Sequence, residues 1–208
     1  MSTQNKDAPA PAATAEQLPG TTSKHTIPKT AIIVTEKCYL RPYEASDAAA
    51  LAEAANDLEV AKYMRTRFPS PYTLADAQSW IAYCLSQPGR TFAIFTPEGE
   101  YFGAVGLEAP TGDGIYAGTR ELGYFSGRKF WGRGIMSEAV RGFTRWAFAT
   151  YPDLLRIEAT VFAPNEASKH VLKKAGFVKE GTRRLAIVKN GEQADEDMFS
   201  LIRSDIEA

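Results

Sequence analysis

The stretch GRKFWGRGIMSEAVRGFTRW, residues 127–146, joins a strand-like segment to a run with a strong helical pattern. From Gly134 onward, apolar residues recur at helical spacing and charged residues fall between them. The apolar face consists of Met136, Ala139, Val140, Phe143, Trp146 and Ala147, and the polar face of Glu138, Arg141 and Arg145. This spacing predicts a strand, a glycine loop and an amphipathic helix in succession.

The loop before this helix has the composition of an anion site. A helix N-terminus presents unpaired backbone N–H groups and the positive end of the helix dipole. Gly132 and Gly134 would let a phosphate come closer to the main chain than a β-carbon permits, and Lys129, Arg133 and Ser137 are near neighbours. Taken alone, the two glycines also fit an ordinary turn with solvated basic residues around it.

Two other glycine-rich phosphate motifs do not fit the loop. A nucleoside triphosphate loop, GxxxxGK[ST], needs Lys and then Ser or Thr after its second glycine, where this chain has Arg133-Gly134. A dinucleotide fingerprint needs a third glycine where Ser137 stands, and an N-terminal βαβ unit. Neither nucleotide class is therefore indicated.

The flanking sequence predicts one mixed α/β domain. Its elements are a strand (35–43), a helix capped by Ser46-Asp47 and ending near Asn56, a helix capped by Thr73, two strands (90–110) around Glu98-Gly99, a strand (119–127), the amphipathic helix, a strand (155–163), a helix (165–177) capped by Asn165, and a hairpin around Asn190-Gly191. Strands and helices in this order are typical of a single mixed sheet with helices around it.

Composition excludes several classes of function. The 208 residues include 24 Lys and Arg against 25 Asp and Glu, so the chain lacks the basic excess of a nucleic-acid binder. Two cysteines and two histidines, Cys38, Cys84, His25 and His170, do not supply a zinc ligand set, and we expect no metal. A Cys38–Cys84 disulfide is conceivable, but both lie in apolar segments, which favours buried free thiols and a reducing, cytoplasmic location. No apolar run is long enough to span a membrane.

The N-terminal segment differs from the rest in composition. Residues 1–28 are rich in Ala, Pro, Thr and Ser and predict a disordered tail that lacks the apolar centre of a signal peptide. Residues 29–208 contain enough apolar material for one domain with one sizeable core.

The combined motifs resemble the GNAT superfamily of acetyl-coenzyme A-dependent N-acetyltransferases, and within it the Rim-type branch that acetylates protein N-termini. KFWGRG (129–134) is similar to the superfamily signature [QR]xxGx[GA], with lysine at the first place; IMSEA and the AGF at 175–177 match as well. The resemblance covers about residues 35–205. It implies a GNAT fold with a mostly antiparallel sheet, acetyl-CoA as co-substrate, a primary amine on a peptide N-terminus or small molecule as acceptor, and a monomer or homodimer.

The resemblance also assigns residues to the co-substrate. The main chain from Lys129 to Gly134 would hold the pyrophosphate, and the pantetheine arm would lie along the edge of the preceding strand. Asn165 would hydrogen-bond that arm, although a plain helix N-cap explains it equally well. The expected acetyl-CoA residues are Tyr124, Phe125, Ser126, Lys129, Phe130, Trp131, Gly132, Arg133, Gly134, Ser137 and Asn165.

The implied reaction is attack of a neutral amine on a thioester, with loss of a thiolate. Glu121 matches the position where many relatives carry a general base, although a surface salt bridge is the alternative, and Glu108 is the second candidate. Leu172 stands where many members place a tyrosine acid, so Ser168 is the expected proton donor. His170 falls on the polar face beside lysines and is expected to be solvated.

Two questions stay open at this stage. The rival to an enzyme is a non-catalytic acyl-CoA binder or sensor that keeps the loop without the chemistry. Arg65 and Arg67 lie in the segment that would form one wall of the acceptor groove, and they indicate either carboxylate-bearing substrates or plain surface charge.

Overall fold

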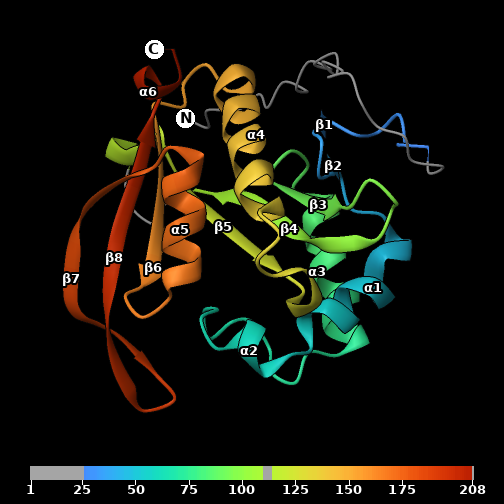
Figure 1. Ribbon diagram of the computed structural model, residues 1–208, viewed down its shortest axis with the longest axis horizontal. Helices are drawn as coiled ribbons and strands as arrows, with labels where there is room; N and C mark the ends of the chain where they lie inside the picture. Colours follow the sequence, from blue (N-terminus) through green and yellow to red (C-terminus); the bar gives the residue numbers. More distant parts are fainter. Residues whose placement is uncertain (1–25, 110–113, 208) are drawn as a thin grey trace, which may run out of the picture.

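Eight strands form one sheet in the described part of the chain, residues 26–109 and 114–207 of this computed structural model. The order is β1-β2-β3-β4-β5-β6-β8-β7, and every neighbouring pair is antiparallel except β5 and β6 (Figure 1). The strands are β1 (Ile33–Val34), β2 (Tyr39–Arg41), β3 (Thr91–Phe95), β4 (Tyr101–Glu108), β5 (Thr119–Ser126), β6 (Arg156–Phe162), β7 (Val178–Lys189) and β8 (Glu192–Ile202).

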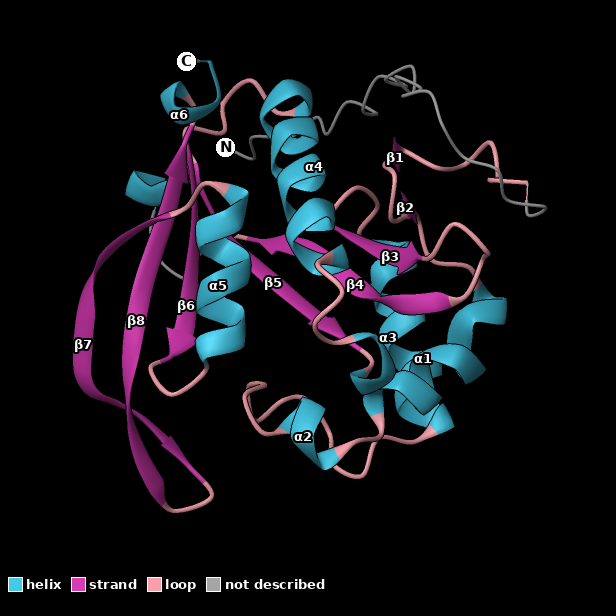
Figure 2. Cartoon of the chain, viewed as in Figure 1, coloured by secondary structure: helices cyan, strands magenta, loops and turns pink. Residues whose placement is uncertain are grey.

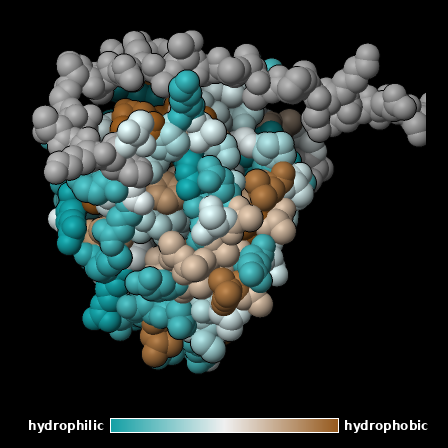
Figure 3. Space-filling view, turned by 90° about the vertical axis from the view of Figure 1, so that its right-hand side faces the viewer, coloured by the Kyte–Doolittle hydropathy of each residue, from teal (hydrophilic) through white to brown (hydrophobic). Residues whose placement is uncertain are grey.

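Helices cover both faces of this sheet (Figure 2). Successive residues of a strand point to opposite faces, and β3 shows the result: Phe92 and Ile94 enter the core under α4 and α5, and Ala93 and Phe95 the core under α1 and α3. The helices are α1 (Ala48–Ala55), α2 (Leu58–Ala61), α3 (Leu74–Ser86), α4 (Ile135–Thr150), α5 (Glu166–Ala175) and α6 (Ser204–Glu207). On the outer surface visible in Figure 3, apolar side chains are scattered among hydrophilic ones.

The amphipathic helix predicted from the sequence is α4. Its apolar stripe is buried, with Val140, Phe143 and Ala147 fully excluded from solvent. Burying a side chain such as Phe143 contributes about 1.5–3 kcal/mol, so this face fixes α4 against the sheet. The direction of β5 and the start of α4 then place the loop between them at the carboxyl end of β5, in the interior of the strand order.

The parallel pair opens the sheet. β5 and β6 pair only at Thr119–Arg156, Arg120–Ile157 and Glu121–Glu158. Beyond these positions β5 stays with β4 and β6 stays with β8, so the two strands separate. The separation leaves one edge of β5, from Leu122 to Ser126, without a neighbouring strand.

Most element predictions are confirmed. Thr73 caps α3, Gly99 lies in the turn between β3 and β4, and Asn190-Gly191 form the tight turn of the β7–β8 hairpin with φ of 52° and 83°. Cys38 and Cys84 are buried free thiols, as the apolar pattern indicated. The predicted tail falls on residues 1–28, of which 1–25 lie outside the described residues.

Two local predictions near the N-terminus are wrong. The single strand over residues 35–43 is shorter, because Thr35 to Cys38 form a turn that joins β1 to β2. Asp47 does not cap α1 with its side chain.

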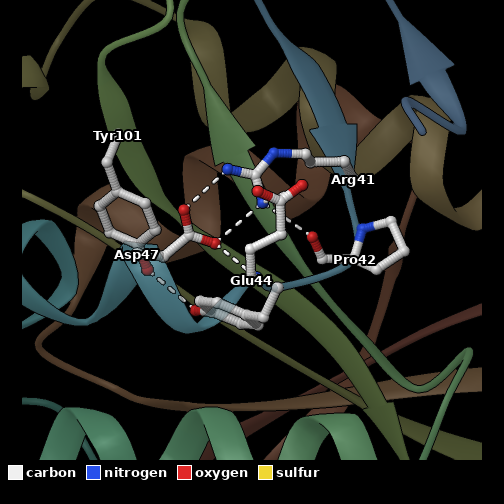
Figure 4. A network of polar contacts seen from close by, with 6 residues as sticks. Arg41, Pro42, Glu44, Asp47 and Tyr101 are labelled. Atoms are coloured by element: carbon white, nitrogen blue, oxygen red, sulfur yellow. Dashed lines mark hydrogen bonds and ion pairs between the residues drawn. The ribbon is translucent and has the colours of Figure 1, made fainter. Parts of the chain in front are cut away.

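The carboxylate of Asp47 is engaged elsewhere (Figure 4). It accepts two hydrogen bonds from Arg41, at 2.7 and 2.8 Å, and one from the backbone N–H of Glu44 at 2.8 Å. The Arg41 guanidinium also donates to the carbonyl of Pro42 and lies over the ring of Phe95. A buried, bidentate ion pair therefore replaces the expected helix cap.

Candidate functional site

A cleft with a cavity volume of about 1550 Å³ lies where β5 and β6 separate. Its walls come from β4, β5, β6, the first turn of α4, the helices α3 and α5, the β7–β8 hairpin and the segment 63–69. Eleven of the thirteen residues selected from the sequence line it: Glu121, Tyr124, Phe125, Ser126, Phe130, Trp131, Gly132, Gly134, Ser137, Asn165 and Ser168. Lys129 and Arg133 do not.

The glycine loop presents its backbone to this cleft. Gly132 and Gly134 have φ of 78° and 75°, a left-handed conformation that L side chains rarely adopt. A β-carbon at Gly132 would meet no atom within 4 Å, so the space beside it is open. Glycine is thus required by the backbone as well as by close approach.

The start of α4 leaves several donors unpaired. In the described part of the chain, no acceptor is found for the backbone N–H groups from Gly132 to Ser137. Gly134 occupies the N-cap position and has no side chain to satisfy them. These donors, together with the helix dipole, suit a bound phosphate or pyrophosphate.

The charged residues around the loop are arranged differently from the sequence expectation. Lys129 pairs with Glu100 on the turn before β4, and Arg133 lies over the ring of Phe130, 5.5 Å from its centre. Lys37 instead approaches the loop, with its Nζ 3.6 Å from the point where a β-carbon of Gly134 would lie. Sequence reasoning missed Lys37 because only the fold brings the β1–β2 turn to α4.

Two aromatic residues of the motif have structural roles in addition to lining the cleft. Phe130 is buried against Phe102, which fixes the loop to the core. The indole N–H of Trp131 donates to the carbonyl of Ser126 at 3.2 Å. The Ser126 carbonyl thus has one acceptor position occupied and can accept a second hydrogen bond, and the open edge of β5 runs from Leu122 to Ser126.

Two hydroxyl groups meet across the separation of the strands. Tyr124 Oη lies 2.7 Å from Ser168 Oγ, a contact in which either oxygen can donate, and 3.3 Å from the Ser168 carbonyl, which can only accept. Burial raises the pKa of Tyr124, and the Ser168 hydrogen bond opposes the rise only in part, so the phenol stays protonated. Leu172, at the position on α5 where a tyrosine acid was considered, is buried. Tyr124 instead brings a phenol to the first turn of α5 from β5.

Asn165 acts as the N-cap of α5. Its Oδ1 accepts the backbone N–H of Ser168 at 3.1 Å, which confirms the capping alternative. The cap holds Ser168 in place, and Asn165 itself lines the cleft. His170 is exposed, as expected for the polar face.

Three glutamates form a row across the sheet. Glu108, Glu121 and Glu158 are direct register partners on β4, β5 and β6, so their side chains share one face. Tyr124 is an odd number of positions from Glu121 and belongs to the opposite face. The glutamates and the hydroxyl pair thus approach the gap from its two sides. Glu158 was missed, because its strand gave no sign of its register.

Each glutamate of the row has an arginine partner. Arg65 pairs with Glu121, and Arg67 Nη2 lies 2.6 Å from Glu108 Oε2. Arg156 Nε lies 3.4 Å from a Glu158 oxygen.

Burial changes the ionisation of the central carboxyl. Burial raises the pKa of Glu121, Arg65 opposes the rise, and the negative charges of Glu108 and Glu158 add to it. The salt-bridge alternative is therefore realised, yet Glu121 also lines the cleft.

Comparison with known proteins agrees with this geometry. Residues 37–178 match the acetyltransferase (GNAT) domain family. The chain is 34% identical over 177 residues to the uncharacterised N-acetyltransferase p20 of Bacillus licheniformis, which covers 82% of this chain and 96% of that protein. The chain belongs to the GNAT acetyltransferase family.

Solved structures of GNAT acetyltransferases confirm the fold. The ribosomal-protein-S5-alanine acetyltransferase of Vibrio fischeri has a TM-score of 0.70 and 26% identity, over 83% of this chain and 96% of that one. Mycobacterium smegmatis RimJ, in complex with CoA-disulfide, has a TM-score of 0.68 and 24% identity, over 82% and 84% of the two chains. The GNAT assignment, the mixed and mostly antiparallel sheet and the Rim-type resemblance predicted from the sequence are all confirmed.

Family membership makes this GNAT protein an acetyl-CoA-dependent acetyltransferase. The unpaired N–H groups of the 132–137 segment and the open space beside Gly132 fit the pyrophosphate of that co-substrate. Among the described residues, no group of His, Cys, Asp or Glu is arranged to hold a metal ion. None of the helices in residues 26–109 and 114–207 is long and apolar enough to cross a membrane.

Proposed function

We propose that the protein transfers the acetyl group of acetyl-CoA directly to a primary amine while both are bound in the cleft. One observation carries the proposal. A single cavity connects the unpaired N–H groups at the start of α4 with the Tyr124–Ser168 pair and with Glu121. The three features correspond to the phosphate end, the thioester and the amine of a ternary complex.

The main chain supplies most of the co-substrate contacts in this proposal. The N–H groups from Gly132 to Ser137 hold the pyrophosphate, and Lys37 adds positive charge beside them. The open edge of β5 offers backbone groups to the amides of the pantetheine arm, and the Asn165 amide faces the same arm. Acetyl-CoA brings the activated acyl group and a thiolate leaving group.

One proton transfer and one hydrogen bond are assigned to side chains. Glu121 removes the proton that the acceptor amine must lose, directly or through a water molecule. Ser168 donates a hydrogen bond to the departing thiolate, and Tyr124 donates to Ser168 Oγ through the 2.7 Å contact, so both hydroxyl groups stay protonated and the thiolate takes its proton from water. Because a thiol has a pKa of about 8.5, the thiolate leaves readily and a hydrogen bond is sufficient for this second step.

The acceptor follows from the chemistry and from the relatives. An α-amine, with a pKa of about 8, is neutral in roughly a tenth of molecules at pH 7, whereas a lysine amine is neutral in only a few per ten thousand. We therefore place a peptide N-terminus first and a small-molecule amine second; the name of the ribosomal-protein-S5-alanine acetyltransferase of Vibrio fischeri, whose substrate is a protein, supports this order. The two buried free thiols are consistent with a cytoplasmic enzyme, working as a monomer or homodimer.

Release of free thiol from acetyl-CoA, measured across a panel of amines and N-terminal peptides, tests the proposal. Steady turnover with at least one acceptor is expected. Calorimetry with CoA runs in parallel, because the sensor alternative predicts binding without turnover. Binding with no turnover on any amine would overturn the enzymatic assignment.

A further inference from the structure

The acceptor side of the cleft contains an arrangement that the proposed reaction does not use. Arg65 and Arg67 stand two residues apart on the segment between α2 and α3, and their partners Glu121 and Glu108 are directly opposite each other on β5 and β4. Both arginine side chains are more than half exposed, and both residues line the cleft. They are therefore accessible to a ligand that enters from this side.

The segment that carries the arginines is anchored at both ends. Lys189, from the β7–β8 hairpin, donates its ammonium hydrogens to the carbonyls at the end of α2, at 2.6 Å for Ala61 and 3.1 Å for Lys62. At the other end, Phe68 packs against Tyr72 and Phe125. Arg65 and Arg67 thus project from a held segment, which reduces the ordering cost of binding a ligand.

An arriving amine competes with Arg65 for the same carboxylate. The guanidinium occupies Glu121 Oε1, and the acceptor reaches Glu121 as an ammonium ion. Two cations beside one carboxylate repel each other, so Arg65 must move away or find a second anion. A carboxylate carried by the acceptor would supply that anion, and each positive charge would keep a partner.

We propose, building on the function proposed above, that the acceptor carries a carboxylate close to its reactive amine and that Arg65 and Arg67 bind it. The amine takes the place of Arg65 on Glu121, and the acceptor carboxylate accepts hydrogen bonds from the guanidinium groups. The planar, multi-donor guanidinium suits a carboxylate. A polyamine has no group for these arginines and would meet two positive charges.

Matched acceptors test this assignment. The first pair is alanine and alaninamide, which differ in the α-carboxylate. The second pair is the amide-terminated dipeptides Ala-Asp and Ala-Asn, which differ in a side-chain carboxylate. Spermidine is added as a carboxylate-free amine. The pair that shows the difference identifies the source of the carboxylate.

For the wild-type protein we expect kcat/KM to be roughly 10- to 100-fold higher for the acid than for the amide of one pair. In Arg65→Gln and Arg67→Gln the ratio should fall toward one, mainly through KM for the acid. Arg183→Gln is the control, because Arg183 is as exposed as Arg67, pairs with Glu196 at 2.6 Å and does not itself line the cleft. It should keep the wild-type ratio.

Four results would overturn the inference. Equal kcat/KM within both pairs, or a preference for spermidine, would exclude a carboxylate site while the acetyltransferase function stood. An equal loss for acid and amide in Arg67→Gln would show that this arginine only neutralises Glu108. CoA binding with no turnover on any acceptor would remove the proposed function, and this inference with it.

Discussion

Substitution of Gly132 by alanine tests whether the loop holds a phosphate through its main chain. The methyl group would meet no protein atom within 4 Å, so any ligand that it displaces must occupy the open cleft. The left-handed φ of 78° costs an alanine about 1–2 kcal/mol. For a domain of this size the melting temperature should fall by about 2–8 °C.

Gly191→Ala is the matched control. Gly191 lies in the β7–β8 turn with φ of 83°, also has open space around it, and does not line the cleft. It should lose the same stability and keep its CoA affinity. In Gly132→Ala, by contrast, loss of one charge-assisted hydrogen bond to the phosphate should cost about 1.5–3 kcal/mol, which corresponds to a roughly 10- to 150-fold larger dissociation constant for CoA.

Isothermal calorimetry with CoA, together with thermal melts of both variants, measures the two effects separately. The reasoning is refuted if Gly132→Ala and Gly191→Ala show the same melting loss and both bind CoA as tightly as the wild type. Phosphate would then not approach the backbone at Gly132.

Three further predictions concern single side chains. Glu121→Gln should lower the rate at neutral pH about 10²- to 10⁴-fold, and the rate of the variant should recover as the pH rises toward the pKa of the amine. Because burial raises the pKa of Glu121 and only the carboxylate is a base, the wild-type rate should begin to fall at a pH above the usual glutamate pKa of about 4.3. A pH–rate series on both proteins measures the two effects. Tyr124→Phe should lower kcat with little change in CoA affinity. Tyr151→Phe, which removes a 2.8 Å hydrogen bond of a tyrosine that does not line the cleft, should leave kcat unchanged. Equal kcat in the two variants would show that the Tyr124 hydroxyl has no part in the reaction. Asp47→Asn should destabilise the fold by about 3–5 kcal/mol in urea unfolding, against less than about 1 kcal/mol for the exposed Lys129–Glu100 pair broken in Glu100→Gln. A similar small loss for both variants would mean that the buried pair is not important for stability.

Sequence patterns predicted the helices and turns that depend on interactions between residues close in the chain. The α4 helix was readable because its apolar residues repeat over four turns, and the β7–β8 hairpin because Asn190-Gly191 tolerate the left-handed turn. Asp47 was misread because its side chain fits two local roles, and only the distance to Arg41 decides between them.

The site was predicted in part for the same reason. The loop and the α5 cap are continuous in sequence, and both lie where the motif indicated. Lys37, Glu158 and the Tyr124–Ser168 contact depend on strand register and on pairings between distant segments. Periodicity carries no information about which strands become neighbours.

The short contact between β5 and β6 has a mechanical consequence. In the plane of the sheet the two halves of the molecule are joined at three ladder positions, and the packing of α4 against α5 and the hydrogen bonds from Lys189 to the end of α2 add to this connection. A ligand bound between β5 and β6 would contact both halves, fix the distance between them and connect them to each other. The rigidity of the protein would then depend on whether this gap is occupied. An acceptor that binds after the first ligand would bind to a protein that is already more rigid.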